Sequence, residues 1–484
     1  MIEHKDLREW IEQAKKIGEL KEIEGADPHL EVGTMVQLDG KNEGPALLFS
    51  KLKGHSDRFK ILTNSMANIR SFNLTFGLPV EYAIRQSVET LKGKAAEWAA
   101  TAKDFPAKVV SSGPILQNVE EGDAVDLSKF PVPVWHEEDG GEYIGTGVGI
   151  ITRDPDTGQV NIGTYRVQRH DKRTVGFYIS PGKHGRIHRD KYFERGQPCP
   201  VAMVFGWDPM SFALSASEIP HGIFELDYLG AARGEPVPVI KGKVTGLPIP
   251  ANAEIAVEGF SSPTDVMLEG PFGEWTGYYA SSARKEPFLK VAALYYRNDP
   301  IILGCPPSKG LYADQGFFRA VWRSALLYNE IERAGIPEVK GVWSPAFGGS
   351  RLFNIVSIRQ SYPGHATEAG HIASQTRAGA YLGKYVVVVD DDIDPYDMED
   401  VMWALSTRSD PLEIDFIKRA WSGPLDPRIR KPTDNFHNSH AIIYAVKPYE
   451  WFKDFPHTSV ATEKLRKDVF SKWTRHFDGR WKII

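Results

Sequence analysis

The chain contains only two cysteines, Cys199 and Cys305, in 484 residues. A pair so far apart in sequence provides neither a disulfide framework nor the clustered spacing of a cysteine zinc site. Neither residue lies beside a histidine base in sequence, so we expect both to be buried and inert rather than nucleophilic. The scarcity of cysteine fits a reducing compartment, and we expect a cytoplasmic protein.

Long apolar runs are also missing. The longest aliphatic run, Val386 to Val389, has the length of a strand and is far shorter than the ~20 residues that cross a bilayer. The N-terminus has the spacing of an amphipathic helix rather than of a signal peptide, with Leu7, Trp10 and Ile11 on one face. We therefore expect no association with a membrane.

A large excess of one charge is absent too. The chain has 58 Lys and Arg against 63 Asp and Glu, which gives a formal net charge of -5. This balance indicates no nucleic-acid partner, and any anionic cofactor must be bound by local cations. The remaining composition is that of an ordinary globular protein, and 484 residues are too many for one compact core. We expect two or three domains.

The pattern of apolar residues divides the chain into regions. Residues 1–115 mix helical patterns with short strands and predict an N-terminal α/β region. Residues 116–312 carry many short strands separated by turn signals, which is typical of a barrel or sandwich. A helical pattern over 313–336 predicts a connecting helix, and helix and strand alternate over 337–460 before a C-terminal tail, 461–484. The fold class is therefore α/β in the broad sense (α+β).

The alternating region contains one clear buried strand, Tyr385 to Val389. Asp390, Asp391 and Asp392 follow it, and capping or solvation explains these acids as well as ligand binding does. We expect the next helix to begin at Pro395, with Asp394 as its N-cap.

Two carboxylates lie five residues apart in the segment Glu269-Gly270-Pro271-Phe272-Gly273-Glu274. Proline and the flanking glycines favour a tight, shaped loop. Two acids held close in such a loop repel each other, which moves their pKa values apart and suits one of them to proton transfer. The alternative is a surface turn with two solvated glutamates.

A second segment runs from Asn161 to Arg166. Strand alternation places these two residues on opposite faces, because their spacing is odd. Both serve one site only if Gly163 marks a bulge or if the ligand lies across the strand end. A functional arginine here binds a carboxylate or phosphate, whereas the alternative is a salt-bridged surface residue.

Two further segments carry metal-ligating residue types. Lys183 to Arg189 is rich in cations and contains His184 and His188, which share a face if the segment is helical. The segment Glu225 to Pro236 is rich in acids. Amide oxygen, imidazole and carboxylate together form a fairly hard ligand set that suits Mn²⁺ or Mg²⁺.

In their order and spacing these segments resemble the UbiD family of reversible decarboxylases, which includes ferulic acid decarboxylase and 3-octaprenyl-4-hydroxybenzoate carboxy-lyase. The resemblance covers nearly the whole chain, and its segments are residues 135–144, 161–166, 225–236, 254–259, 269–279, 389–394 and 400–405. It implies a split β-barrel that binds prenylated FMN, followed by a C-terminal α/β oligomerisation domain.

The resemblance also implies site residues. A divalent metal, Mn²⁺ or Mg²⁺, holds the cofactor phosphate with K⁺ nearby. Its ligands are implied to be Asn161, His184 and Glu225, with His188 as the alternative histidine. The implied cofactor contacts are Thr146, Gly163, Thr164, Arg166, Lys183 and Lys384.

The implied catalytic residues are Arg166, Glu269 and Glu274. Loss of carbon dioxide from an sp² carbon needs an electron sink, which the modified flavin supplies. Arg166 holds the substrate carboxylate or the flavin edge, Glu269 fixes the rotamer of Arg166, and Glu274 delivers a proton to the carbon. Burial and the neighbouring Glu269 are expected to raise the pKa of Glu274.

The expected reaction is non-oxidative decarboxylation of an aromatic, heteroaromatic or α,β-unsaturated carboxylic acid. The expected partners are this small acid, a prenylated-FMN synthase that supplies the cofactor, and further copies of the chain in a homodimer or homohexamer. Three alternatives stand beside it: an oxidoreductase using ordinary FMN, a non-catalytic subunit of a carboxylase complex, and a glycosidase using the paired acids. The segment Ser215 to Pro220 departs from the family pattern and leaves the substrate open.

Overall fold

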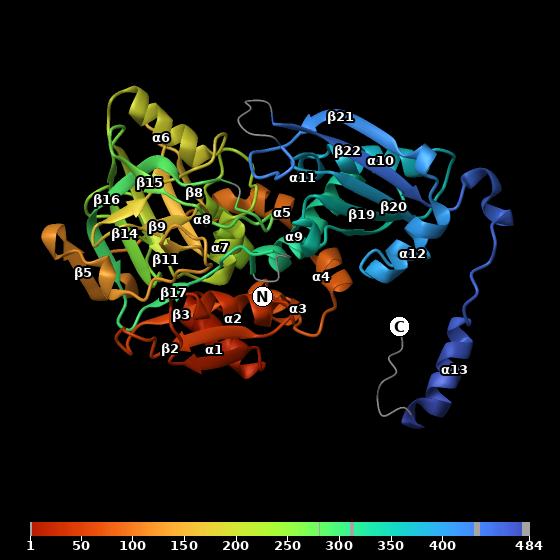
Figure 1. The fold of residues 1–484 in the computed structure, drawn as a ribbon, viewed down its shortest axis with the longest axis horizontal. Coiled ribbons are helices and arrows are strands. Elements are labelled where there is room, and N and C mark those ends of the chain that lie inside the picture. The colour runs from red at the N-terminus through yellow and green to blue at the C-terminus, as the bar shows by residue number, and fades with distance from the viewer. Residues whose placement is uncertain (1, 280, 310–313, 430–435, 477–484) are drawn as a thin grey trace.

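The computed structural model describes residues 2–279, 281–309, 314–429 and 436–476 of the chain. Its described strands form four sheets of four, ten, three and five strands. In Figure 1 the ten-stranded sheet lies at the left, the five-stranded sheet at the right, and helix α9 between them. The expected mixture of helices and strands is confirmed.

The ten-stranded sheet is a curled half-barrel, in keeping with the barrel or sandwich that the run of short strands predicted. Its strand pairs are antiparallel. Its main path has the order β6-β9-β10-β16-β14-β11-β7-β8, and β5 and β15 both pair with the long strand β16. The strands are β5 (Asn118–Glu121), β6 (Glu142–Gly145), β7 (Val148–Arg153), β8 (Val160–Gly163), β9 (Val167–Arg169), β10 (Thr174–Gly176), β11 (Cys199–Phe205), β14 (Ile255–Ser261), β15 (Val266–Glu269) and β16 (Arg284–Tyr296). Three helices accompany it: α6 (His184–Glu194), α7 (Pro209–Ser215) and α8 (Glu225–Arg233).

The N-terminal region contributes a smaller sheet and a set of helices. The sheet has the order β1-β2-β3-β17, and β17 pairs in parallel with β3 although it follows the large sheet in sequence. The chain therefore returns to the N-terminal region before it enters α9. The elements are α1 (Leu7–Lys16), β1 (Leu20–Glu24), α2 (Glu31–Gly40), β2 (Ala46–Ser50), β3 (Lys60–Thr63), α3 (Ile69–Thr75), α4 (Ile84–Leu91), α5 (Lys94–Thr101) and β17 (Ile301–Leu303), and a three-stranded sheet adds β4 (Lys108–Val109), β12 (Pro238–Lys241) and β13 (Pro248–Pro250).

The C-terminal sheet has β20 at its centre, flanked by parallel β19 and β22. This confirms the buried strand that the aliphatic run predicted. Helix α12 begins at Met398 and is capped by Asp397, whose side chain accepts from the Glu399 amide at 2.9 Å. The predicted start at Pro395 with Asp394 as N-cap is therefore wrong. The elements are β18 (Val339–Trp343), β19 (Phe353–Ile358), α10 (His365–Gln375), α11 (Arg377–Ala380), β20 (Tyr385–Asp390), α12 (Met398–Arg408), β21 (Asp415–Trp421), β22 (His437–Ala445) and α13 (Glu463–Trp473).

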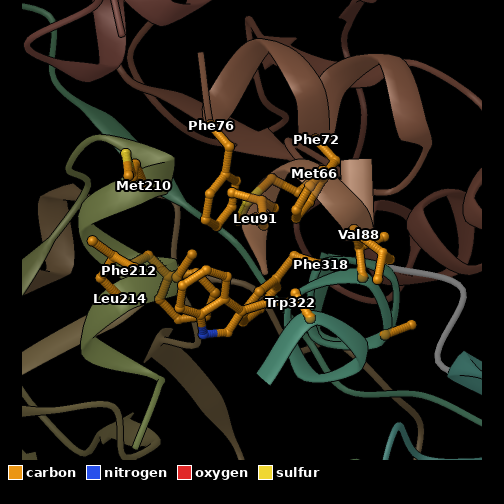
Figure 2. Packing of buried hydrophobic residues seen from close by; sticks show 14 of the residues in the cluster. Met66, Phe72, Phe76, Val88, Leu91, Met210, Phe212, Leu214, Phe318 and Trp322 are labelled. Carbon is orange, nitrogen blue, oxygen red and sulfur yellow. The ribbon is translucent and has the colours of Figure 1, made fainter. Parts of the chain in front are cut away.

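Helix α9 (Asp314–Arg333) packs against the N-terminal helices and against α7 (Figure 2). Trp322 stacks on Trp98 with ring centroids 5.5 Å apart, and Phe318 meets Phe212 edge-on at 5.9 Å. Aromatic rings of this size supply much of the apolar area that holds three regions of the chain together. The predicted connecting helix is thus a central packing element.

The cysteines and the helices agree with what the sequence lacks. Both cysteines are buried, and burial raises the pKa of Cys199 to about 12, so its thiol is inert at neutral pH. In the described part of the chain, no helix is both long and apolar enough to cross a membrane.

Candidate active site

The candidate site is a cavity of about 470 Å³ between the large sheet and the C-terminal region. This volume lies within the range of ordinary small-molecule sites. Its wall includes the strand-end residues from Asn161 to Arg166, the start of α6, the segment after α7, and Arg319 of α9. From the C-terminal region it includes Tyr381 and the loop from Ser422 to Leu425.

Arg166 binds both predicted carboxylates. Its Nε and Nη2 donate to the two oxygens of Glu269 at 2.7 and 2.8 Å, and its Nη1 donates to Glu274 Oε1 at 2.5 Å. The side chains of Arg166 and Glu269 are 8% and 2% exposed, and that of Glu274 is 16% exposed. Burial alone favours the neutral guanidine, but the bonds to Glu269 and the charges of both acids raise the pKa of Arg166 overall. The structure therefore adds a shared cation between the two acids.

The loop that carries the acids is tightly held. Gly270 has a φ of +85°, a left-handed conformation that suits glycine, and its amide donates to Gln168 Oε1 at 3.2 Å. Tyr143 donates its hydroxyl to Glu269 at 3.2 Å. Burial and the charge of Glu269 raise the pKa of Tyr143, so this hydroxyl remains a donor. Glu274 faces the cavity, whereas Glu269 lies behind Arg166.

The strand-end alternative explains how Asn161 and Arg166 share one site. Strand β8 ends at Gly163, and Arg166 lies in the segment before β9. The alternation of side chains along a single strand therefore does not force Asn161 and Arg166 onto opposite faces. Both line the cavity. A Cβ at Gly163 would lie within 3 Å of the ring of Tyr165, so a larger residue at this turn requires that ring to move.

Glu225 and Asn161 form a second polar group in the cavity wall. Asn161 Nδ2 donates to Glu225 Oε1, and the Ile162 amide donates to Glu225 Oε2 at 2.7 Å. Burial raises the pKa of Glu225 to about 8, although these amide donors oppose the shift. Asn161 Oδ1 is buried and, within the described residues, accepts no hydrogen bond. A carboxylate and an orphaned amide oxygen on one surface fit a hard cation.

The two candidate histidines differ in position. His184, the first residue of α6, lines the cavity and meets His221 edge-on, with ring centroids 5.2 Å apart. His188 is buried, and its Nδ1 lies 3.0 Å from Thr152 Oγ1. Burial lowers the pKa of both rings, that of His188 to about 4. His184 is therefore the histidine available to a ligand in the cavity, although the described residues contain no ready-made group of three or more His, Cys, Asp or Glu for a metal.

The implied cofactor contacts are not all brought together. Thr146, Gly163, Thr164 and Lys183 line the cavity with Arg166. Lys384 is outside the described lining, and its Nζ binds the buried Asp426 at 2.7 Å. The structure thus places Lys384 against Asp426, whereas the family resemblance implied a phosphate contact.

Sequence reasoning missed a second group of charges in the cavity wall. Glu218, in the segment that departs from the family pattern, accepts from Arg351 Nη2 at 2.8 Å, and Arg319 of α9 lines the same wall. Burial alone would raise the pKa of Glu218, but Arg351 and Arg323 hold it well below its ordinary range. These residues come from three distant segments, and no local motif marks them.

Comparison with known families covers most of the chain. The N-terminal, Rift-related and C-terminal domain models of 3-octaprenyl-4-hydroxybenzoate carboxy-lyase match residues 11–91, 108–310 and 316–445. The chain belongs to the UbiD family. It is thus a decarboxylase by family, which confirms the resemblance that the sequence segments indicated.

Among UbiD relatives, pyrrole-2-carboxylic acid decarboxylase of Pseudomonas aeruginosa is 31% identical over 434 residues, which is 85% of this chain and 84% of the relative. Phenolic acid decarboxylase of a Streptomyces species is 30% identical over 421 residues, covering 84% of this chain and 85% of the relative.

Solved UbiD-class structures share the whole fold. HmfF of Pelotomaculum thermopropionicum, solved in complex with FMN, has a TM-score of 0.82 and 27% identity, and covers 97% of this chain and 100% of its own. Vanillic acid decarboxylase of Sedimentibacter hydroxybenzoicus, in an open form, has a TM-score of 0.82 and 26% identity, and covers 98% of this chain and 99% of its own.

Proposed function

We propose that this protein catalyses the reversible, non-oxidative decarboxylation of an aromatic, heteroaromatic or α,β-unsaturated carboxylic acid with prenylated FMN. The main support for this proposal is the guanidinium of Arg166, which is fixed by Glu269 and bonded to Glu274 in the wall of a ligand-sized cavity. Relatives named as decarboxylases of pyrrole-2-carboxylic and phenolic acids support this substrate class, and a neighbour solved with prenylated FMN supports the cofactor.

Each of the three residues has a separate task. Glu269 uses both oxygens on Arg166 and fixes its rotamer, so the remaining guanidinium edge orients a substrate carboxylate. Glu274 delivers a proton to the carbon that loses carbon dioxide, and in the carboxylation direction it removes that proton. Its bond to Arg166 holds it at the cavity surface between proton transfers.

The residues present fit the implied cofactor and metal. Asn161 Oδ1, Glu225 and His184 would hold Mn²⁺ or Mg²⁺ beside the phosphate, since the orphaned amide oxygen and the buried carboxylate both gain from a cation. Thr146, Thr164, Gly163 and Lys183 would line the flavin, with K⁺ nearby. When bound, the modified flavin supplies the electron sink for the carbon that loses carbon dioxide.

The proposal includes partners and a location. A prenylated-FMN synthase would supply the cofactor, and the C-terminal region would join copies of the chain into a homodimer or homohexamer in the cytoplasm. One related structure is an evolved dimeric form of HmfF. The vanillic acid decarboxylase structure also contains a truncated second protein, ShVdcD.

The test is a panel of aryl, heteroaryl and acrylic acids incubated in D₂O with protein made alongside a prenylating enzyme. We expect carbon dioxide to be released and one deuterium to appear on the carbon that carried it. The mass of the extracted cofactor separates prenylated from ordinary FMN. Flavin reduction by a nicotinamide donor, with no carbon dioxide from any acid, would instead support an oxidoreductase.

A further inference from the structure

Two aromatic rings lie over the guanidinium of Arg166. The centroid of the Tyr178 ring is 4.8 Å from Arg166 Cζ, and that of the Phe272 ring is 5.7 Å from it. Both rings line the cavity together with Arg166. These distances are within the range of about 6 Å over which the face of a ring attracts a cation. Because the Arg166 side chain is only 8% exposed, little water weakens this attraction.

The rings and the carboxylates restrain Arg166 in different directions. The bonds to Glu269 and Glu274 come from N–H groups, which lie in the plane of the guanidinium. These bonds resist a shift within that plane more than a tilt out of it. A ring over the face of the guanidinium resists the tilt. The in-plane bonds and the contact with Tyr178 therefore complement each other.

The ring of Tyr178 is itself held by contacts that do not involve Arg166. Its hydroxyl lies 3.2 Å from Ser180 Oγ. Arg284 also lies over this ring, with its Cζ 4.4 Å from the centroid. Arg284 stands opposite Glu269 in the pairing of β15 with β16, and its Nε donates to Glu286. Tyr178 is thus a fixed surface against which Arg166 can rest.

We propose that Tyr178 is a positioning residue, whose ring keeps the guanidinium of Arg166 from tilting and so prepares it for the substrate carboxylate. This inference rests on the proposed function, because it deepens the role given there to Arg166. Phe272 is the poorer place for a test. Its ring packs on Tyr143 with centroids 4.1 Å apart and lies within the loop of Glu269 and Glu274, so a change there would disturb both acids.

The experiment compares three variants with the wild-type protein, all made with the prenylating enzyme. Tyr178→Leu removes the ring, whereas Tyr178→Phe removes only the hydroxyl. Tyr385→Leu is the control, because Tyr385 is an exposed tyrosine outside the described cavity lining. Flavin absorbance measures the cofactor content of each protein.

Two ligands of similar shape separate an effect on Arg166 from an effect on the cavity. Calorimetry gives the Kd of phenylacetate and of phenylacetamide, which has the same ring but no charge. The carboxylate of phenylacetate is on an sp³ carbon and lies outside the proposed reaction, so its binding is measured without turnover. Carbon dioxide release gives kcat/KM for pyrrole-2-carboxylate. Crystal structures of wild type and Tyr178→Leu compare the Arg166 side chain directly.

We expect Tyr178→Leu to weaken phenylacetate binding by about 5- to 30-fold, which is the range for one desolvated cation–π contact. The reason is that Arg166 must then be ordered when the acid binds. The kcat/KM for pyrrole-2-carboxylate should fall by a similar factor, and the Arg166 guanidinium should be tilted or in more than one position. Phenylacetamide should change by less than about threefold, and Tyr178→Phe and Tyr385→Leu should resemble wild type. Flavin content should stay the same.

Several results would overturn the role of Tyr178. Unchanged binding of phenylacetate in Tyr178→Leu is one. Equal weakening of both ligands would assign the ring to the shape of the cavity, and loss of flavin would assign it to the cofactor. If the wild-type protein binds neither ligand, the crystal structures decide, and an Arg166 guanidinium that keeps one unchanged position in Tyr178→Leu overturns the proposal.

Failure of the proposed function would look different. No acid would then release carbon dioxide from the wild-type protein. The preference for phenylacetate over phenylacetamide, its loss in Tyr178→Leu and the movement of Arg166 would still be measurable. Conversely, normal carbon dioxide release by both wild type and Tyr178→Leu would retain the proposed function and reject the positioning role.

Discussion

Two buried carboxylates in or beside the same cavity differ in whether a cation of the chain balances their charge. Glu269 receives two hydrogen bonds from Arg166, so its charge is balanced by the chain itself. Glu225 receives amide donors from Asn161 and Ile162 and, among the described residues, has no ion pair, and burial raises its pKa to about 8. A buried carboxylate needs a cation to remain charged. The end of the cavity with Arg166, Glu269 and Glu274 (the acid end) therefore carries its own cation. In our proposal the end with Glu225 (the metal end) receives its cation from the bound metal.

The acid end gives the largest expected effect. In Glu274→Gln the amide keeps the shape of the side chain but has no proton to deliver, so decarboxylation should fall by about 10²- to 10⁴-fold. Flavin absorbance should not change, because Glu274 is not part of the metal end. Steady-state carbon dioxide release measures the loss, and Glu235→Gln, an exposed acid outside the cavity, is the control. Turnover within tenfold of wild type would remove Glu274 from its assigned role.

Isosteric changes at the two buried acids test the comparison directly. Glu225→Gln should purify with less than about a tenth of the wild-type Mn²⁺ and flavin, because the metal loses its charged ligand. Glu269→Gln should keep its flavin and lose turnover by about 10²-fold, because Arg166 is no longer fixed. Metal analysis and flavin absorbance of the purified proteins measure the Mn²⁺ and flavin content of both variants, and carbon dioxide release measures turnover. Equal flavin loss in both variants would show that the two ends are not separate.

The pH dependence of metal binding should come from the same carboxylate. Since the pKa of Glu225 is raised to about 8, the side chain must release a proton before it binds Mn²⁺, so affinity should rise by up to about tenfold per pH unit and level off above pH 8. His184 adds no slope near neutrality, because burial lowers its pKa. Calorimetric titration with Mn²⁺ at several pH values measures this. The slope should disappear in Glu225→Gln, and a slope that persists there would belong to another group.

The sequence predicted the elements that local patterns specify. The aliphatic run at Val386 gave a central strand, and the proline–glycine loop placed Glu269 and Glu274 together, because both signals act over a few residues. The start of α12 was misplaced by three residues. Asp394 accepts the Tyr396 amide at 3.0 Å in a turn, and Asp397, with the same side chain, caps the helix instead. Two aspartates so close in sequence offer competing caps.

The arrangement of charges was harder to predict than their identity. The odd spacing of Asn161 and Arg166 left two geometries, and only the end of β8 at Gly163 decides between them. Glu218, Arg319 and Arg351 come together because the segment after α7, helix α9 and the loop before β19 meet in the cavity wall. Such a cluster depends on tertiary contacts between distant segments, so neither periodicity nor a motif reveals it.

Lys384 gives the smallest functional effect and extends the comparison to a third buried acid. Burial alone would raise the pKa of Asp426, but its bond to Lys384 and neighbouring donors lower it. Lys384→Met removes the cation and leaves Asp426 uncompensated, as Glu225 is. Because Lys384 is outside the described cavity lining, flavin content should change by less than about twofold.

The cost of Lys384→Met should appear in stability, by about 1–3 kcal/mol at pH 7 in denaturant unfolding. The lowered pKa of Asp426 means that the pair stabilises the fold above the ordinary aspartate pKa and loses this contribution as the pH falls through the folded-state value. The difference between wild type and variant should therefore shrink below about pH 4. A variant that keeps its stability at pH 7 but loses its flavin would return Lys384 to the phosphate contact that the family resemblance implied.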